Sequence, residues 1–256
     1  MRELAYFRVC RALGWLLRSA RYSSARIVYR NGGRQVRKYR SFYAPLLVWL
    51  GNVLLRVLDT GVRVLPEPDW HERESQIYRS LYGTSVRVDV DGTLILPCLA
   101  GETLATLLED PALQEPVRMK SIECAALALA EFHLRGFTHG DAMAENVLVD
   151  LAPRPYVGRW FDFETIHDSH RPMAWRRADD VRALLTTCLI RTQPERLAET
   201  LQLILDAYAD EELSRLLGTS FSPMLRRPLT FHLAQAGLSI QSFREISRLL
   251  QARFGQ

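Results

Sequence analysis

Hydrophobic and polar residues alternate in short runs in the first part of this chain, and this pattern predicts antiparallel strands. Two such runs, at 25–30 and 35–39, flank the sequence Asn-Gly-Gly at 31–33, which is a strong signal for a hairpin turn. A second hairpin is predicted around the Asp-Gly pair at 91–92, which lies between two apolar runs. We therefore expect a small antiparallel sheet here.

Elsewhere the apolar residues recur every three or four positions, which predicts helices with one buried face. Residues 2–18 combine such a face with Arg8, Arg11 and Arg18, and residues 44–58 are almost entirely apolar. The last part of the chain is rich in leucine at helical spacing and contains no cluster of catalytic residue types. The predicted helices are 2–18, 44–58, 69–82, 121–135, 177–185 and several between 195 and 256.

Length and composition fit a soluble globular protein. A chain of 256 residues, of which 48% are hydrophobic, can bury a sizeable core as one large domain or as two lobes. Its four cysteines are widely scattered without a Cys-x-x-Cys pair, which favours a reducing cytoplasm over a disulfide framework or a zinc site. No apolar run reaches the roughly 18 residues of a membrane span. Arginines interrupt the N-terminal segment, so we expect no secretory signal and a cytoplasmic location.

The charge is distributed unevenly along the chain. Residues 1–63 hold thirteen Lys or Arg and only two acids, a net charge of +11, whereas the remainder carries −7. Such a basic segment predicts an anionic partner: nucleotide phosphates, an anionic membrane surface or nucleic acid. Its arginines do not alternate with aromatic residues in a stacking pattern, which argues against nucleic acid. The apolar helix at 44–58 either packs on its neighbours or, with helix 2–18, makes peripheral contact with the inner face of an anionic membrane.

One polar motif carries recognisable chemistry. His139-Gly140-Asp141 is followed by Asn146, an apolar strand, turn residues, a second strand and then Asp162. A hairpin of that length would bring Asn146 and Asp162 together. Phosphoryl transfer from ATP needs this set: one carboxylate at the acceptor hydroxyl and two oxygen ligands for magnesium. A surface loop with ordinary acidic and amide residues is the alternative, but the spacing disfavours it.

The His-Gly-Asp spelling, with Asn146 and an Asp-Phe pair at 162–163, resembles the catalytic motifs of the protein-kinase-like superfamily. It is closest to aminoglycoside phosphotransferases and to lipopolysaccharide and related small bacterial kinases, and the resemblance covers roughly residues 20–190. It implies an α+β fold of two lobes, with a small antiparallel-sheet N-lobe and a mostly helical C-lobe. The expected division is a basic helix at 1–18, an N-lobe at 19–98 with a helical insertion at about 41–60, and a C-lobe at 99–256 that contains the catalytic loop.

The same resemblance implies roles for the motif residues. Asp141 would orient and deprotonate the acceptor hydroxyl, and Asn146 and Asp162 would hold Mg²⁺. The extended segment that leads into Gly-Glu-Thr-Leu resembles the hinge that binds the adenine edge of ATP. Its amide donor would come from Cys98 or Leu99, because the preceding proline has none.

A lysine and a glutamate complete the implied nucleotide site. Lys38 is one of only two lysines among 33 basic residues, and it stands where a kinase-like fold places its phosphate-binding lysine. Glu74 shares the core side of the helix at 69–82 and would position Lys38. Arg37 and Glu72 are the alternatives if the strand or helix register differs.

Two residues near the motif are expected to hold the catalytic loop in place. Asp180, near the start of the helix at 177–185, would bond loop amides in the way implied by the resemblance. His139 would bond the loop's backbone and is not expected to act as the base, and His133 is expected to serve packing.

Three departures from the family pattern bear on function. No glycine-rich loop precedes the first strand, where 18–24 read Arg-Ser-Ala-Arg-Tyr-Ser-Ser, and Glu164 follows Asp-Phe where glycine is usual. Only seventeen residues separate Asp162 from Asp180, which leaves little room for the peptide platform of a protein kinase. The expected acceptor is therefore a small molecule, a saccharide or a lipid-linked sugar. A protein Ser/Thr kinase and a pseudokinase that only binds nucleotide or a partner are the alternatives.

Overall fold

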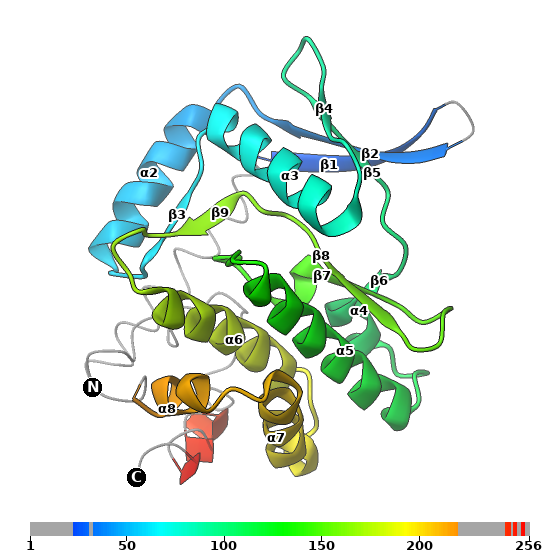
Figure 1. The fold of residues 1–256 in the computed structure, drawn as a ribbon, viewed down its shortest axis with the longest axis vertical. Coiled ribbons are helices and arrows are strands. Elements are labelled where there is room, and N and C mark those ends of the chain that lie inside the picture. Colours follow the sequence, from blue (N-terminus) through cyan, green and yellow to red (C-terminus); the bar gives the residue numbers. More distant parts are fainter. Residues whose placement is uncertain (1–22, 31–32, 220–243, 247, 250–251, 254–256) are drawn as a thin grey trace.

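A computed structural model describes residues 23–30, 33–219, 244–246, 248–249 and 252–253. It is an α+β structure in which small antiparallel sheets combine with a larger helical part (Figure 1). The predicted helix at 2–18, the turn residues 31–32 and most of the chain after 219 lie outside the described residues.

Both predicted hairpins are present in one four-stranded sheet. Its antiparallel order is β1-β2-β5-β4, and the register sets Arg30 opposite Gly33, so two residues connect the first pair. In the interior strand β2, Lys38 lies between Ala25 of β1 and Leu94 of β5. The strands are β1 (Ser23–Arg30), β2 (Gly33–Arg40), β4 (Arg87–Val88) and β5 (Leu94–Pro97).

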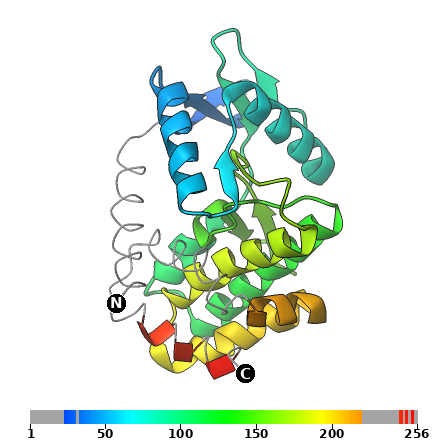
Figure 2. The same cartoon turned by 90° about the vertical axis from the view of Figure 1, so that its left-hand side faces the viewer.

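Two helices stand beside this sheet, as predicted. In α3 (Glu67–Tyr82), residues 70, 74, 77 and 78 are buried, a helical spacing that turns one face to the core. Gly83 ends the helix in the left-handed conformation with φ of 62°. The helix α2 (Ala44–Val57) lies outside α3 at the edge of the molecule (Figures 1 and 2). At about 1.5 Å per residue it is far shorter than a bilayer core, and none of the described helices is long and apolar enough to cross a membrane.

A pairing that the sequence did not predict joins distant parts of the chain. Strand β3 (Val62–Val64), which directly follows α2, pairs antiparallel with β9 (Thr165–His167). Asn52 of α2 fixes β3, because its Nδ2 donates to the Val64 carbonyl at 2.9 Å and its Oδ1 accepts from the Val64 amide at 2.7 Å. The segment that follows Asp162 is thereby attached to the helix-and-strand unit around α2.

The remaining elements form the helical part and a three-stranded sheet of order β6-β7-β8. The hairpin β7–β8 confirms the strands predicted on either side of the turn residues at 150–155, with Val147 opposite Trp160. Two helices are longer than predicted, since α5 begins at Glu115 and α6 at Met173. The elements are β6 (Glu102–Thr103), α4 (Leu104–Glu109), α5 (Glu115–Leu134), β7 (Val147–Asp150), β8 (Val157–Trp160), α6 (Met173–Leu189), α7 (Leu197–Tyr208) and α8 (Glu211–Thr219).

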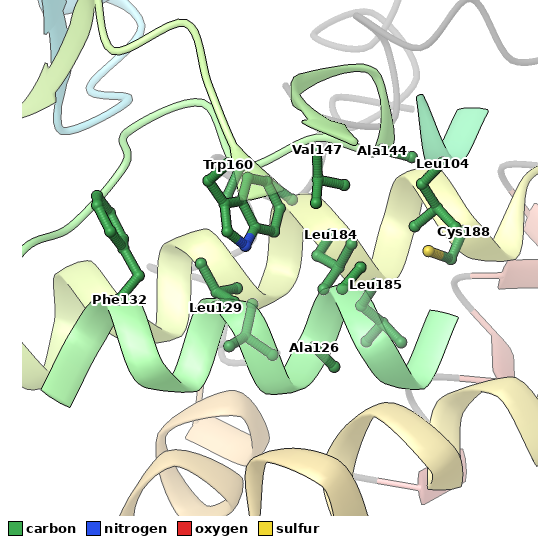
Figure 3. Close-up of a cluster of buried hydrophobic side chains, with 14 of the residues drawn as sticks. Leu104, Ala126, Leu129, Phe132, Ala144, Val147, Trp160, Leu184, Leu185 and Cys188 are labelled. Carbon is green, nitrogen blue, oxygen red and sulfur yellow. The ribbon is translucent and has the colours of Figure 1, made fainter. Parts of the chain in front are cut away.

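A hydrophobic core lies between α5, α6 and the β7–β8 hairpin. Figure 3 shows Leu129 and Phe132 of α5 beside Leu184 of α6, with Val147 and Trp160 above them. All five side chains are at most 1% exposed. Close packing of this kind resists displacement, so the segment between α5 and β7, which contains His139, Asp141 and Asn146, rests on a rigid base.

Candidate active site

A cavity of about 330 Å³ lies against the inner face of the four-stranded sheet and contains most of the predicted site. Alternate residues of β1 and β2 line one side, as expected for one face of a pleated sheet. Lys38, Glu74 and Asp162 line its inner end, and the segment after β5 closes another side. Cys98 and Leu99 of that segment also line it.

Three charged side chains meet at the inner end of the cavity. Lys38 Nζ donates to Glu74 Oε1 at 3.1 Å and forms a second, short hydrogen bond with Asp162 Oδ1. Lys38 is 5% exposed and Glu74 is fully buried. Burial alone would lower the pKa of Lys38, but the carboxylates of Asp162, Glu74 and Glu164 together raise it above its ordinary value. The lysine is therefore held charged.

Glu74 links three elements through one oxygen. Its Oε1 accepts hydrogen bonds from Lys38, from Trp70 Nε1 at 3.2 Å and from the backbone amide of Phe163 at 3.2 Å. The contact with Phe163 ties α3 to the residue after Asp162. The predicted pairing of Lys38 with Glu74 is confirmed. The alternatives lie elsewhere, since Glu72 is exposed and Arg37 pairs with Asp89 at 3.4 Å.

Sequence reasoning missed a second cation beside this cluster. Arg40 follows Lys38 on the same face of β2, and its Nη2 lies 3.4 Å from Glu164 Oε2. Its guanidinium carbon lies 4.4 Å from the centre of the Trp70 ring, a cation–π geometry, and its Nη1 donates to the Leu65 carbonyl at 2.6 Å. Glu164 thus joins the segment after Asp162 to β2. The sequence did contain a signal for this arrangement. Lys38 and Arg40 are two residues apart in a predicted strand, so their side chains point to the same face.

Asp141 and Asn146 form the second part of the site. Asn146 Nδ2 donates to the Asp141 carbonyl at 2.8 Å and to Asp141 Oδ2 at 3.0 Å, which orients the carboxylate. Burial is the main cause that raises the pKa of Asp141 to about 8, and the negative charge of Asp162 adds to it, while the bond from Asn146 opposes the shift. The influence of Asp162 on Asp141 reflects their proximity.

Asp180 anchors the loop that presents Asp141, as predicted. Its Oδ2 accepts from the His139 amide at 2.7 Å and its Oδ1 from the Gly140 amide at 2.8 Å. Gly140 has φ of +82°, and a Cβ there would lie 3.1 Å from the backbone of Ile166. His133 Nε2, 2.9 Å from Asp180 Oδ2, supports the same carboxylate. The loop backbone is therefore held by a buried carboxylate that itself has partners.

His139 holds the loop from the other side, and its geometry is that of a neutral ring. Its Nδ1 accepts from the Asp141 amide at 3.3 Å, so Nε2 carries the proton and donates to the Phe161 carbonyl at 3.0 Å. Burial lowers the pKa of His139 to about 4. The prediction that His139 bonds the backbone is confirmed.

This lowered pKa predicts a pH-dependent stability. Because folding favours the neutral ring, the contribution of His139 is present above its ordinary pKa of about 6.5 and is lost as pH falls towards about 4. His139→Gln keeps a donor for the Phe161 carbonyl but does not titrate. Between pH 7 and pH 4 its free energy of unfolding should therefore fall by up to about 3 kcal/mol less than that of wild type. Urea unfolding of both proteins at pH 7, 5.5 and 4 measures it, and the exposed His170→Gln is the control. If the free energy of unfolding changed equally with pH in wild type and His139→Gln, the assignment of a neutral His139 ring in the folded protein would be contradicted.

Asn146 and Asp162 carry oxygen atoms of the kind that Mg²⁺ prefers as ligands. Both bonds from Asn146 to Asp141 use Nδ2, so its Oδ1 is the atom available for a metal, and Asp162 offers a carboxylate. Asp162 has φ of +67°, a conformation that Asp tolerates better than most residues and that is often found at functional sites. Within the described residues no group of three or more His, Cys, Asp or Glu could hold a metal. Two protein oxygens suffice where phosphates and water complete the shell, as is usual for Mg²⁺.

The outer part of the cavity is apolar and suits a flat ring. Ala25, Ile27 and Val36 come from β1 and β2, and Leu148 comes from β7. The chain passes into β6 through Gly101, whose φ is +114° and where a Cβ would lie 2.7 Å from Val149 of β7. Only glycine permits this close approach, which places the segment at Cys98 and Leu99 along the cavity.

Comparisons with known proteins add no assignment: no family model matches the chain, and no curated protein is significantly similar to it. The geometry of the site is therefore the basis for inferring a function.

Proposed function

We propose that this chain is an ATP- and Mg²⁺-dependent phosphotransferase with a two-lobed protein-kinase-like fold, acting on a hydroxyl group. The observation that supports it best is the meeting of residues from distant parts of the sequence: Lys38, Glu74 and Asp162 line one cavity, and the bonded pair Asp141 and Asn146 lies close enough to Asp162 for its charge to act on Asp141. Any one of these residues is common, but a buried Lys–Glu pair beside an Asp, with an Asp–Asn pair next to it, matches the parts that phosphoryl transfer requires.

In this mechanism the protein acts mainly by positioning and by charge. Lys38, held charged by its carboxylate neighbours, binds the phosphates, and Glu74 fixes its direction. Asn146 Oδ1 and the Asp162 carboxylate would hold a magnesium ion, which would supply positive charge to offset that of the phosphates. Asp141, oriented by Asn146, accepts the proton of the acceptor hydroxyl in its ionised form. A cation held beside Asp162 would favour that form, because it would offset the negative charge that helps to raise the pKa of Asp141. The apolar walls around Val36 and Leu148 take the adenine ring, with a backbone amide of Cys98 or Leu99 at its edge.

The fixed segment after Asp162 favours a small, saccharide or lipid-linked acceptor over a protein. Glu164 is bonded to Arg40, and β9 is paired with β3, so the segment is held in one conformation. Protein kinases instead order a long activation segment around their peptide substrate. The alternatives are a protein Ser/Thr kinase and a nucleotide-binding pseudokinase.

The proposal predicts slow, Mg²⁺-dependent ATP hydrolysis without acceptor and faster phosphate transfer in its presence. We would measure release of γ-phosphate with Mg²⁺ or EDTA, and then screen sugars, lipid-linked saccharides and a generic protein for labelled phosphate. Transfer to a saccharide or lipid supports the proposal, and transfer to protein supports the protein-kinase alternative. Binding of ATP without hydrolysis or transfer would leave the pseudokinase alternative.

A further inference from the structure

The outward face of α2 is apolar along its whole length. Seven large hydrophobic side chains are between 45% and 93% exposed on the helix and in the two residues that precede it. They repeat at 43, 46, 50, 53 and 57, a spacing that forms a single stripe on a helix. The residues of this stripe are Phe42, Tyr43, Leu46, Trp49, Leu50, Val53 and Val57.

The stripe is not needed to attach α2 to the rest of the protein. A separate face of the helix, with Ala44, Val48, Gly51 and Leu55, is already buried, and Asn52 bonds β3. In the part of the chain that the structure describes, no helix or strand covers the outward face (Figures 1 and 2). A contiguous apolar surface of this extent on a soluble protein marks an interaction site.

The charges around the stripe indicate what binds there. From Ser41 to Leu58 there is no acidic residue, and the only charged side chain is the exposed Arg56. Arg63, in the adjoining β3, is also exposed, and the first acid after the helix, Asp59, is paired with Arg171 at 2.6 Å. An apolar stripe with a cationic end favours an anionic surface, and residues 1–63 carry +11 in total.

The residue types favour a lipid surface over a protein partner. Tyr43 and Trp49 combine an apolar ring with a polar group, which suits the headgroup level of a bilayer. A short, convex amphipathic helix with Trp and Leu outward and basic residues at its border is the form that lies in the membrane interface. We infer that α2 binds the surface of an anionic lipid bilayer, with its axis in the plane of the membrane and Trp49 inserted among the headgroups and upper acyl chains.

This contact has a direct structural connection to the catalytic region. β3 follows α2 after four residues and pairs with β9, which begins three residues after Asp162. Membrane contact through α2 would bring a lipid-borne hydroxyl acceptor to the segment beside the metal ligands. This second step, unlike the binding itself, rests on the proposed function.

Quenching of Trp49 by brominated lipids tests the inference in the full chain. Trp70, Trp160 and Trp175 are at most 8% exposed, so in a Trp15→Phe background Trp49 is the tryptophan that lipid can reach among the described residues. We would add vesicles of phosphatidylcholine with or without phosphatidylglycerol, carrying brominated acyl chains, in the absence of ATP. The expected result is quenching and a blue shift with the anionic vesicles, both weakened by salt.

Substitutions on the stripe give the matched comparison. Leu46→Gln/Val53→Gln should weaken the vesicle partition coefficient by at least about tenfold, since each loses an apolar side chain from the interface. Val88→Gln/Val90→Gln removes two exposed valines elsewhere, at the end of β4 and in the turn that follows it. This variant should leave the partition coefficient unchanged.

Three outcomes would overturn the inference. Vesicle binding that is equal in wild type and Leu46→Gln/Val53→Gln would assign the contact to another segment, such as residues 1–18. A blue-shifted Trp49 without lipid, insensitive to brominated chains, would mean that the chain itself covers the stripe. Concentration-dependent self-association that the same variant abolishes, without vesicle binding, would identify a second copy as the occupant. None of these results depends on ATP, so failure here is distinct from failure of the proposed function.

Discussion

Asp141→Asn is expected to lower the rate of phosphate transfer by roughly 10²–10⁴-fold and to leave ATP affinity almost unchanged. The substitution keeps the shape of the side chain and a partner for Asn146, but it removes the carboxylate to which the proposed mechanism assigns the proton transfer. Because the pKa of Asp141 is about 8, the group is mostly neutral near pH 7, and the substitution changes little charge beside Asp162. Binding of the anionic nucleotide should therefore not weaken. The measurement is single-turnover transfer together with calorimetric ATP binding.

Glu145→Gln is the matched control for this substitution. Glu145 lies in the same short turn, but its carboxylate pairs with Arg191 at 2.6 Å. Its loss should leave the transfer rate near that of wild type. If Asp141→Asn transfers phosphate as fast as Glu145→Gln does, Asp141 is not the base and the mechanism is wrong.

Lys38→Met has the second large expected effect, and it acts on both stability and activity. Methionine fills much of the same space but leaves the buried Glu74 and its neighbour Asp162 without their cation. Breaking a buried ion pair on one side costs roughly 3–5 kcal/mol of unfolding free energy. Phosphate transfer should fall below detection, because no compact charge remains at the phosphates.

Lys120→Met provides a matched control, since Lys120 is the only other lysine of the chain. It is 54% exposed and pairs with Glu123 on the surface, so its loss should cost at most about 1 kcal/mol. The double variant Lys38→Met/Glu74→Gln should recover part of the lost stability, because it removes the unpaired buried charge and keeps an oxygen acceptor for Trp70 and the Phe163 amide. It should not recover transfer. Urea unfolding at pH 7 separates these effects from activity, and a Lys38→Met protein as stable and active as Lys120→Met would contradict the assignment.

Much of the structure could be predicted from the sequence because the signals are local. The turn sequences at 31–33 and 91–92 specify hairpins, and the apolar spacing around Glu74 places it on the buried face of α3. The spacing of Asp141, Asn146 and Asp162 also encodes their proximity, since a short hairpin connects them. Asp180 could be placed because the apolar residues that follow it fix the orientation of its helix.

The features that sequence reasoning missed depend on contacts between distant residues. β3 and β9 have three residues each and lie about a hundred positions apart, so neither carries a recognisable period. The strand pattern gives the face on which Arg40 lies, but nothing in the sequence alone identifies its partners. Its contacts with Trp70 and Glu164 depend on the fold. The exposure of the α2 stripe could not be predicted either. An apolar helix has the same sequence pattern whether its neighbours cover one of its faces or two.

The most direct test of the central claim is ATP binding measured by calorimetry with Mg²⁺ and with EDTA, in wild type and Asp162→Asn. Mg²⁺ should tighten ATP binding to wild type by about tenfold or more, through one added charge-assisted ligand. Asp162→Asn should bind ATP with similar affinity in both conditions. Wild-type protein that does not bind ATP, or binds it equally well with EDTA, would contradict the assignment of this cavity as a magnesium–nucleotide site.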